Sequence, residues 1–304
     1  MNTRAPGFAE SPITRHHMQE GSEAIHEPPL GPADIELRQR SALRRYDSWR
    51  KFHDGPRQRE EPLFASLARY PDCVLVAGCQ RSGTTMLTRI IARSRGFQRF
   101  ALTHDDELDA ALILAGDVDV PDDRRYSFQT TYLNERYAEY AKLGPGQRLI
   151  WVLRNPFSVV HSMVYHWKRF ALDELYEGCG LTCAQSNRLR RTSLPWPFGP
   201  SRIEKACLSY KAKTSQIFAV RELVQQQQLL IVEYDTLVRS PGKELRRVFD
   251  FIGERYDDSY ASAVRTDSIR RADRLSVKVN RLIEEHAVPT YRECLMLASG
   301  DPRG

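Results

Sequence analysis

The stretch that decides the fold is Val74-Leu75-Val76-Ala77-Gly78-Cys79-Gln80-Arg81-Ser82-Gly83-Thr84-Thr85. It begins with a short apolar run closed by Gly78, which is typical of a buried central strand. Apolar residues then recur at helical spacing over Thr84 to Arg95 and predict a helix. The order of strand, glycine-bounded loop and helix is the setting in which a nucleotide phosphate loop must lie.

The loop itself has the Gly-x-x-x-x-Gly frame of such a phosphate loop. Successive backbone N–H groups and the helix N-terminus then point at one place and favour an anion. Thr84 stands where a nucleoside triphosphatase has lysine, and the cation, Arg81, lies inside the loop instead. A cation there suits a 5′-phosphosulfate, whose displacement needs positioning and charge stabilisation without an obligatory metal. A tight structural turn that happens to contain two glycines is the plain alternative.

A second apolar run, Leu149 to Leu153, leads into Asn155-Pro156, where proline fits the first turn of a new helix. Arg154 leaves the tip of this strand, and Ser162 lies on the helix. A guanidinium gives phosphate two parallel charge-assisted hydrogen bonds, and a hydroxyl adds another. The alternative is a helix-start proline beside a surface arginine.

Both motifs resemble those of one family. The run Gln80-Arg81-Ser82-Gly83-Thr84-Thr85 resembles the 5′-phosphosulfate loop of sulfotransferases that use 3′-phosphoadenosine-5′-phosphosulfate (PAPS), in its arginine-bearing version. The run Leu153-Arg154-Asn155-Pro156, with Val159, Val160 and Ser162, is similar to the family's 3′-phosphate motif. The resemblance implies that these loop residues, Arg154 and Ser162 bind PAPS. It extends to Glu233-Tyr234-Asp235-Thr236-Leu237, which we interpret as architectural.

Further strands and helices alternate along the chain. A third strand is predicted over 229–232 after a long helical segment from about 203 to 228, and a strand-like segment over 97–102. Lys243 to Ile252 has the pattern of an amphipathic helix closed by Gly253. The pattern predicts a three-layer α/β/α fold with a central parallel sheet and a P-loop-like phosphate-binding turn.

The chain divides unevenly. Residues 1–62 are expected to form a mobile N-terminal arm that contains a basic amphipathic helix, with residues 63–304 forming the sulfotransferase domain. The arm helix places Leu37, Leu43, Tyr46 and Trp49 among many arginines. We expect it to pack on the domain, and peripheral contact with a membrane or a partner is the alternative.

Composition restricts the classes of protein. With 41% hydrophobic and 28% charged residues, the chain is neither disordered nor built from membrane spans of roughly 20 apolar residues. A net charge of +6 attracts anions, but we do not expect nucleic acid to be the partner. No signal-peptide-like apolar run opens the sequence and the six cysteines read as free thiols, so a cytoplasmic location is expected. Oligomeric state is left open.

No metal site is expected. Cys179 and Cys183 have a spacing that could suggest one, but the nearest histidines, His161 and His166, are spaced to fall on different faces of a helix.

The acceptor must lose a proton during transfer, and the candidates for the base cluster in Thr103-His104-Asp105-Asp106-Glu107. Many relatives present the acceptor-activating group there. We favour Glu107 over His104. The alternative is that Asp105 and Asp106 cap the following helix.

The chain departs from the best-known branch of the family, which has lysine in place of Arg81 and closes over the nucleotide with a glycine-rich Trp-Lys segment. Here Lys278 and Arg281 are the candidates to close over the 3′-phosphate. Aromatic residues and arginines between Trp167 and Pro200 suit a sugar, lipid headgroup or phenolic acceptor, or else form the cover of an ordinary loop. The transferred group therefore reaches a hydroxyl or amine of an unidentified acceptor.

Two other functions compete with sulfuryl transfer. A P-loop kinase or similar nucleoside triphosphate enzyme would need Mg²⁺, and the missing lysine at Thr84 counts against it. A non-enzymatic basic binding protein would show a steep salt dependence spread over many arginines.

Overall fold

The computed structural model describes residues 51–52, 54–60, 62–100, 105–133, 137–167, 169–264 and 275–299. Most of the predicted arm, including its basic helix, lies outside these residues. Within the predicted arm, Phe52 is fully buried in the main core. The boundary at residue 62 stays a prediction.

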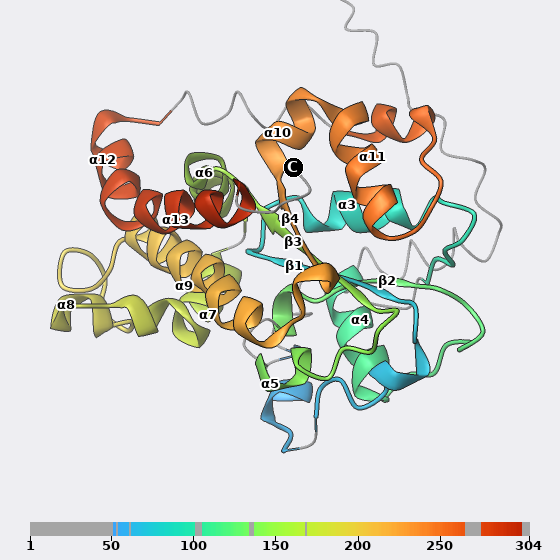
Figure 1. The fold of residues 1–304 in the computed structure, drawn as a ribbon. Coiled ribbons are helices and arrows are strands. Elements are labelled where there is room, and N and C mark those ends of the chain that lie inside the picture. The colour runs from blue at the N-terminus through green and yellow to red at the C-terminus, as the bar shows by residue number, and fades with distance from the viewer. Residues whose placement is uncertain are drawn as a thin grey trace, which may run out of the picture.

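A four-stranded parallel sheet with the order β2-β1-β3-β4 forms the centre of the molecule (Figure 1). Its strands are β1 (Val74–Gly78), β2 (Ser127–Gln129), β3 (Arg148–Leu153) and β4 (Leu229–Glu233). In the register, Gly78 lies opposite Val152, and Leu153 lies opposite Glu233. The carboxyl ends of the three longer strands therefore meet at one edge.

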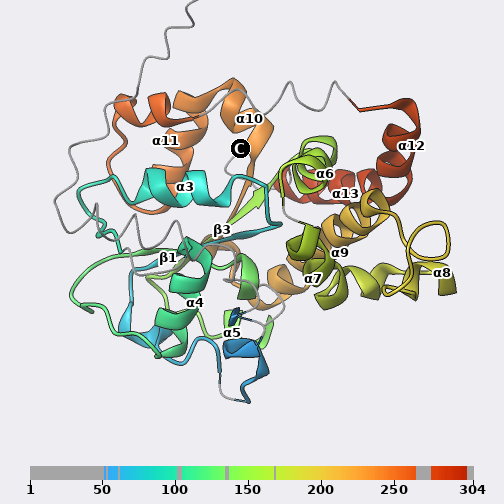
Figure 2. The same ribbon diagram turned by 180° about the vertical axis from the view of Figure 1, so that it is seen from behind.

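Helices cover both faces of the sheet (Figures 1 and 2). Val74 and Val76 of β1 face a core shared with α3 (Thr84–Ile91), α10 (Tyr234–Arg239) and α11 (Pro241–Phe251). Leu75 and Ala77 face the opposite and larger core. That side carries α4 (Asp106–Ala115), α5 (Tyr137–Tyr140), α6 (Pro156–Tyr165), α9 (Arg202–Leu223), α12 (Val277–His286) and α13 (Val288–Ser299). The three-layer α/β/α fold is confirmed.

Two further helices, α7 (Arg169–Gly178) and α8 (Asn187–Arg190), precede α9 in the sequence; α7 contributes Leu172 and Leu175 to the larger core, and α8 lies at the edge of the molecule (Figure 1). Among the described residues, no helix is both long enough and apolar enough to cross a bilayer.

Several predicted boundaries are wrong. The helix expected to reach Arg95 ends at Ile91, whose carbonyl accepts from the Ser94 hydroxyl at 2.9 Å. In the described part of the predicted strand 97–102, Phe97 forms only an isolated bridge with Arg125. The strand beside β1 is instead β2, which is too short and too polar at its ends to give an apolar run.

Candidate active site

A cleft of about 500 Å³ opens at the carboxyl ends of β1 and β3. Its walls come from the phosphate loop, the start of α4, the end of β2 and one side of α6. The lining residues are Gln80, Arg81, Gly83, Thr84, Thr85, Arg89, Asp105, Asp106, Glu107, Gln129, Tyr132, Arg154, Ser158, His161, Ser162, His166 and Trp167. Ligands of open α/β sheets bind at this edge, so the cleft is the candidate site.

Both glycines of the phosphate loop are required by their surroundings. A Cβ on Gly78, at φ 138°, would lie 2.5 Å from the carbonyl oxygen of Val152 on the neighbouring strand. A Cβ on Gly83, at φ 95°, would lie 2.2 Å from Cε2 of Tyr234. Arg81 between them has φ 70°, a left-handed conformation uncommon outside glycine and often found at functional loops.

The two predicted anion-binding motifs meet in the cleft. Arg81 Nε donates to Ser162 Oγ at 3.0 Å, and Arg154 Nη1 donates to the carbonyl oxygen of Arg81 at 2.9 Å. Segments separated by more than 70 residues in the sequence are thus joined by direct hydrogen bonds. The arrangement places two guanidinium groups and a hydroxyl around one space.

Arg154 is held firmly in place. The residue is 6% exposed, and its guanidinium lies 4.3 Å from the centroid of the Tyr234 ring. The Tyr210 hydroxyl donates to the Arg154 carbonyl at 2.7 Å. The next residue, Asn155, donates its backbone N–H to Asp235 at 2.9 Å. Tyr234 and Asp235 come from the stretch interpreted as architectural, and here they position the arginine.

Two polar side chains of the loop are buried without a hydrogen-bond partner among the described residues. Gln80 is 2% exposed and Ser82 is 1% exposed, and the amide of Gln80 and the hydroxyl of Ser82 are both unsatisfied. An unsatisfied buried polar group costs about 1–3 kcal/mol. Gln80 lines the cleft, whereas Ser82 is not among the lining residues. Together with the arginines, the Gln80 amide fits a phosphate or sulfate group as ligand.

The acidic cluster divides into two roles. Asp105 is the N-cap of α4 and accepts from the N–H groups of Glu107 and Leu108 at 3.1 and 2.8 Å, while Asp106 pairs with Arg89 at 2.8 Å. The capping alternative is therefore confirmed for Asp105. Glu107 instead reaches the cleft.

Glu107 is a cleft-lining carboxyl group whose pKa is strongly shifted. Desolvation, followed by the charge of Asp105, raises its pKa to about 8. Gln129 Nε2 donates to the Glu107 carboxyl group. It also donates to Thr84 Oγ1, at 2.9 Å. A carboxyl group that titrates near neutral pH and faces a cleft is suited to proton transfer. His104 lies outside the described residues.

Lys278 and Arg281 are not among the residues that line the cleft. Both are exposed on α12, and Lys278 Nζ lies 5.7 Å from the centroid of the Trp196 ring. Their predicted closure over the 3′-phosphate stays a prediction.

The aromatic residues expected to contact the acceptor do not all lie at the cleft. Trp167 lines the cleft, whereas Tyr176 is buried and donates to the carbonyl of Leu189 at 2.7 Å. Trp196 and Phe198 are exposed to solvent and are not among the lining residues.

Sequence reasoning missed several lining residues. Ser158 and His161 precede Ser162 by four and one positions on α6, so helical spacing alone could have suggested Ser158. The expectation that His161 and His166 face apart is wrong, because α6 ends at Tyr165 and their rings lie 5.3 Å apart. Within the described ranges, no group of three or more His, Cys, Asp or Glu side chains could hold a metal ion.

Comparisons with known proteins agree with the motifs. The sulfotransferase domain family matches residues 71–280, which is more than half of the chain. No curated protein matches the sequence.

Three solved structures are similar at low identity. The mouse sulfotransferase SULT7A1 complexed with PAP has a TM-score of 0.45 and 16% identity, covering 79% of this chain and 94% of that chain. The sulfotransferase domain from the curacin biosynthetic pathway has a TM-score of 0.43 and 14% identity, covering 69% and 84%. Sulfotransferase STF1 from Mycobacterium tuberculosis has a TM-score of 0.42 and 13% identity, covering 83% and 85%. On the sequence match over residues 71–280, this chain belongs to the sulfotransferase domain family.

Proposed function

We propose that this sulfotransferase takes its sulfuryl group from PAPS and transfers it to a hydroxyl or amine of an acceptor. The observation that carries the proposal is the meeting of the two motifs, through the 3.0 Å bond from Arg81 to Ser162 and the 2.9 Å bond from Arg154 to the Arg81 carbonyl. One cleft can then bind both ends of a nucleotide that carries acidic groups at its 5′ and 3′ positions.

The proposed roles follow from the chemistry of each residue. The phosphate loop, with Arg81 and the buried Ser82 hydroxyl, binds the 5′-phosphosulfate at the N-terminus of α3. Arg154 and Ser162 bind the 3′-phosphate, because a guanidinium and a hydroxyl both donate to phosphate oxygens. The 3′-phosphate is what distinguishes PAPS from ATP.

Glu107 is the proposed base. The acceptor oxygen or nitrogen attacks sulfur, the bond from sulfur to the 5′-phosphate oxygen breaks, and 3′,5′-adenosine bisphosphate leaves with the electron pair. The acceptor proton passes to the Glu107 carboxylate. A pKa of about 8 suits this step, because a base works best when its pKa lies near the working pH. His104 stays the alternative base.

Calorimetric titration with 3′,5′-adenosine bisphosphate, AMP and ATP tests the donor class. We expect the bisphosphate to bind most tightly in the wild type. Arg154→Ala should weaken bisphosphate binding by about 10- to 100-fold and AMP binding much less, because the lost charge-assisted hydrogen bonds serve the 3′-phosphate, whereas the lost bond to the Arg81 carbonyl affects both nucleotides. Arg93→Ala, which removes an exposed arginine that does not line the cleft, is the matched control.

Equal binding of AMP and the bisphosphate by the wild type would contradict the donor assignment. Tighter binding of ATP in the presence of Mg²⁺ would favour the kinase-like alternative. Unchanged selectivity in Arg154→Ala would remove this residue from the 3′-phosphate site.

A further inference from the structure

The loop over residues 191–200, between α8 and α9, presents large apolar side chains to solvent. We call it the aromatic loop. Trp196 is 63% exposed, Phe198 is 64% exposed and Leu194 is 42% exposed. Single exposed apolar residues are common on proteins, but three on one loop form a patch that indicates an interaction site.

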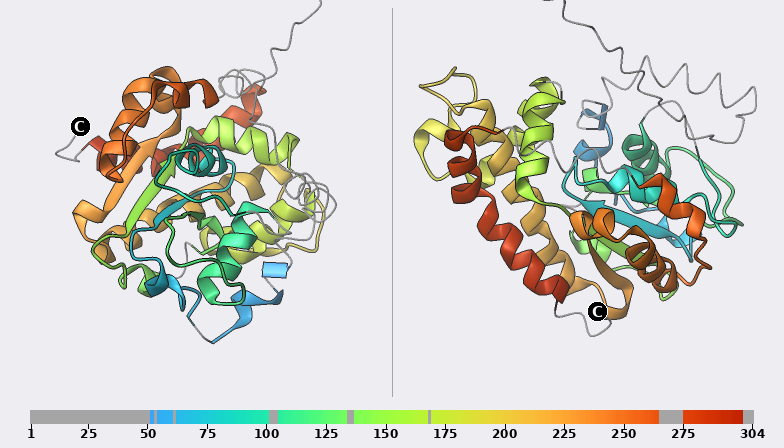
Figure 3. Two further views of the ribbon diagram at one scale, coloured as in Figure 1. Left: turned by 90° about the vertical axis from the view of Figure 1, so that its right-hand side faces the viewer. Right: turned by 90° about the horizontal axis from the view of Figure 1, so that it is seen from above.

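The start of α12 extends this patch. Val277, its first residue, is 79% exposed, and Lys278 Nζ lies 5.7 Å from the Trp196 ring. Figures 2 and 3 show α12 beside the segment that joins α8 to α9, at an edge of the molecule. Two segments far apart in the sequence therefore present one continuous surface.

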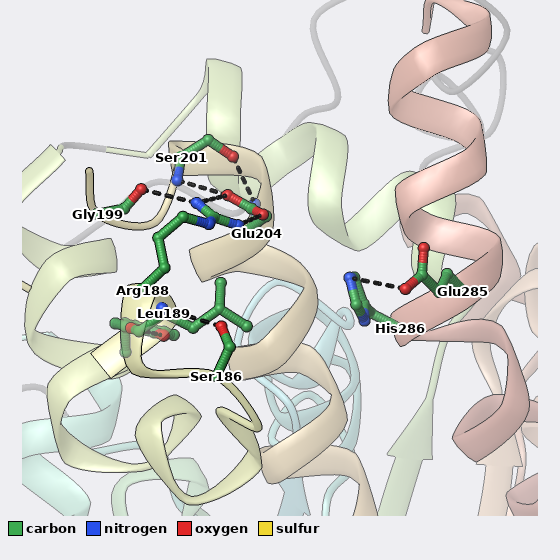
Figure 4. A network of polar contacts seen from close by, with 9 residues as sticks. Ser186, Arg188, Leu189, Gly199, Ser201, Glu204, Glu285 and His286 are labelled. Carbon is green, nitrogen blue, oxygen red and sulfur yellow. Dashed lines mark hydrogen bonds and ion pairs between the residues drawn. The ribbon is translucent and has the colours of Figure 1, made fainter. Parts of the chain in front are cut away.

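The aromatic loop is fixed at its base by a polar network (Figure 4). Arg188 Nη1 donates to the carbonyl of Gly199 at 2.8 Å, and both terminal nitrogens of Arg188 contact the Glu204 carboxylate. Glu204 also accepts from the Ser201 N–H at 2.7 Å, and the Ser201 hydroxyl accepts from the Glu204 N–H at 3.2 Å. The polar network thus lies at the base of the loop, while Trp196 and Phe198 are exposed to solvent. The aromatic side chains are therefore exposed on a loop whose backbone is held in place.

The charged residues beside the patch are mostly basic, and the exposed Glu284 and Glu285 of α12 lie beyond the first two turns of that helix. From residue 178 to residue 203 the sequence contains four arginines and no acidic residue. Arg191, Lys278 and Arg281 are exposed, and none of them pairs with a carboxylate among the described residues. Cations without a carboxylate partner beside exposed aromatic rings complement a surface whose outer layer is negatively charged and whose next layer is apolar.

We propose that the aromatic loop and the first two turns of α12 dock this protein on an anionic membrane surface. Tryptophan and phenylalanine insert at the level of the lipid headgroups, and lysine and arginine attract anionic lipids. A protein partner would need a pocket to enclose the protruding rings, whereas a bilayer accepts them without one.

Docking would also orient the cleft. Arg202, which follows the loop, donates to the carbonyl of Trp167 at 2.6 Å, and Trp167 lines the cleft. The base of the aromatic loop is therefore tied to the rim of the candidate active site. Binding to lipid does not depend on the identity of the sulfuryl donor, so it can fail or succeed independently of the proposed function.

Flotation of the full chain with phosphatidylcholine vesicles, with and without 30% phosphatidylglycerol, tests the proposal. We expect binding only to the anionic vesicles, lost in high salt. The double variant Trp196→Ser/Phe198→Ser should lower the partition coefficient about tenfold or more, because it removes the inserted apolar area. Each of Arg191→Gln, Lys278→Gln and Arg281→Gln should lower it roughly fivefold. Leu223→Ser/Met296→Ser removes exposed apolar side chains elsewhere and is the matched control.

Trp196→Phe gives a second measurement that does not depend on a polar substitution. Wild-type tryptophan emission should shift to shorter wavelength on anionic vesicles, and Trp196→Phe should float as before but lose most of that shift. Equal binding to uncharged vesicles, or equal losses in the control variant, would overturn the proposal. So would a Trp196→Ser/Phe198→Ser variant that loses self-association or a protein partner while the wild type ignores vesicles.

Discussion

The phosphate loop and the aromatic loop are held in place by the same kind of contact, but they present different side chains. In each, an arginine from a neighbouring segment donates to a backbone carbonyl of the loop: Arg154 to Arg81, and Arg188 to Gly199. The phosphate loop buries its polar side chains beside the cleft, whereas the aromatic loop exposes its rings. In both loops, a hydrogen bond from a guanidinium to a backbone carbonyl fixes the path of the loop. The other side chains of the loop then determine whether it faces the cleft with polar groups or faces solvent with aromatic rings.

The carboxyl groups beside the two loops differ in the same way. Glu204 would have its pKa raised by burial, but hydrogen bonds from Arg188 and Ser201 outweigh that effect and lower the pKa. Glu107 is desolvated beside Asp105, and the charges of Lys213 and Arg81 do not compensate, so its pKa is raised. A paired carboxylate serves structure, while a carboxyl group with a raised pKa keeps a proton available for chemistry.

The largest expected effect is that of Gly83→Ala. The added Cβ would meet the Tyr234 ring at 2.2 Å, and displacing that ring removes the partner of the Arg154 guanidinium. Backbone strain of about 1–3 kcal/mol and loss of the cation–π contact should weaken binding of 3′,5′-adenosine bisphosphate about 100-fold, measured by calorimetry.

Gly253→Ala is the matched control for that variant. Gly253 also has positive φ, at 70°, but a Cβ there would meet nothing within 4 Å. Gly253→Ala should therefore introduce the backbone strain of a non-glycine residue at positive φ without weakening the binding of 3′,5′-adenosine bisphosphate. Similar affinities in the two variants would mean that Tyr234 does not support Arg154.

A smaller effect is expected at the aromatic loop. Arg188→Ala leaves the mostly buried Glu204 without its cation, and the partial exposure of Arg188 limits the cost to about 1–2 kcal/mol. The melting temperature should fall by a few degrees, and vesicle binding should weaken because the rings are no longer held. Arg188→Lys should not restore the loop, since lysine cannot bind the carbonyl and carboxylate as a fork.

Arg190→Ala removes an equal charge from the same short helix and serves as control. Its Nε donates to the carbonyl of Ala184 at 3.2 Å, and it forms no ion pair among the described residues. If it lowered the melting temperature as much as Arg188→Ala, charge and not the network would explain the loss.

The phosphate loop was readable from the sequence, and the aromatic loop was not. Strands β1, β3 and β4 are apolar runs, with glycine closing β1 and Asn155-Pro156 following β3, and these are local signals. Their parallel order brings the residues that follow each strand to one edge, and there the structure places Arg81, Arg154 and Ser162, which the resemblance assigned to one nucleotide.

The remaining features depend on contacts between distant segments. The strand β2 has three residues, two of them polar, and only pairing with β1 identifies it. The packing of Tyr234 on Gly83 and the salt bridge from Arg188 to Glu204 leave no periodic trace in the sequence. Exposure of Trp196 is equally invisible, because the sequence shows a tryptophan without showing which way it points.

The last contrast is in pH dependence, where the two carboxyl groups should act with opposite sign. The pKa of Glu107 is raised to about 8 in the folded protein, against about 4.3 when unfolded. Its contribution to stability is therefore complete below about pH 4.3 and is lost as the pH rises through 8. The pKa of Glu204 is lowered, so its contribution is present above about pH 4.3 and is lost as the pH falls through the folded value. Melting temperatures of Glu107→Gln and Glu204→Gln across pH 3 to 9 measure both signs. Glu107→Gln should remove the decline in melting temperature that the wild type shows between pH 5 and 8, and Glu204→Gln should remove the decline that it shows at acidic pH.

The rate of transfer gives a second test of Glu107. If Glu107 is the base, the rate of transfer to a simple phenol should rise through about pH 8 in the wild type, and this rise should be lost in Glu107→Gln. A wild-type profile unchanged by this substitution would leave Glu107 outside the chemistry, and the contrast between the two carboxyl groups would then be one of burial alone.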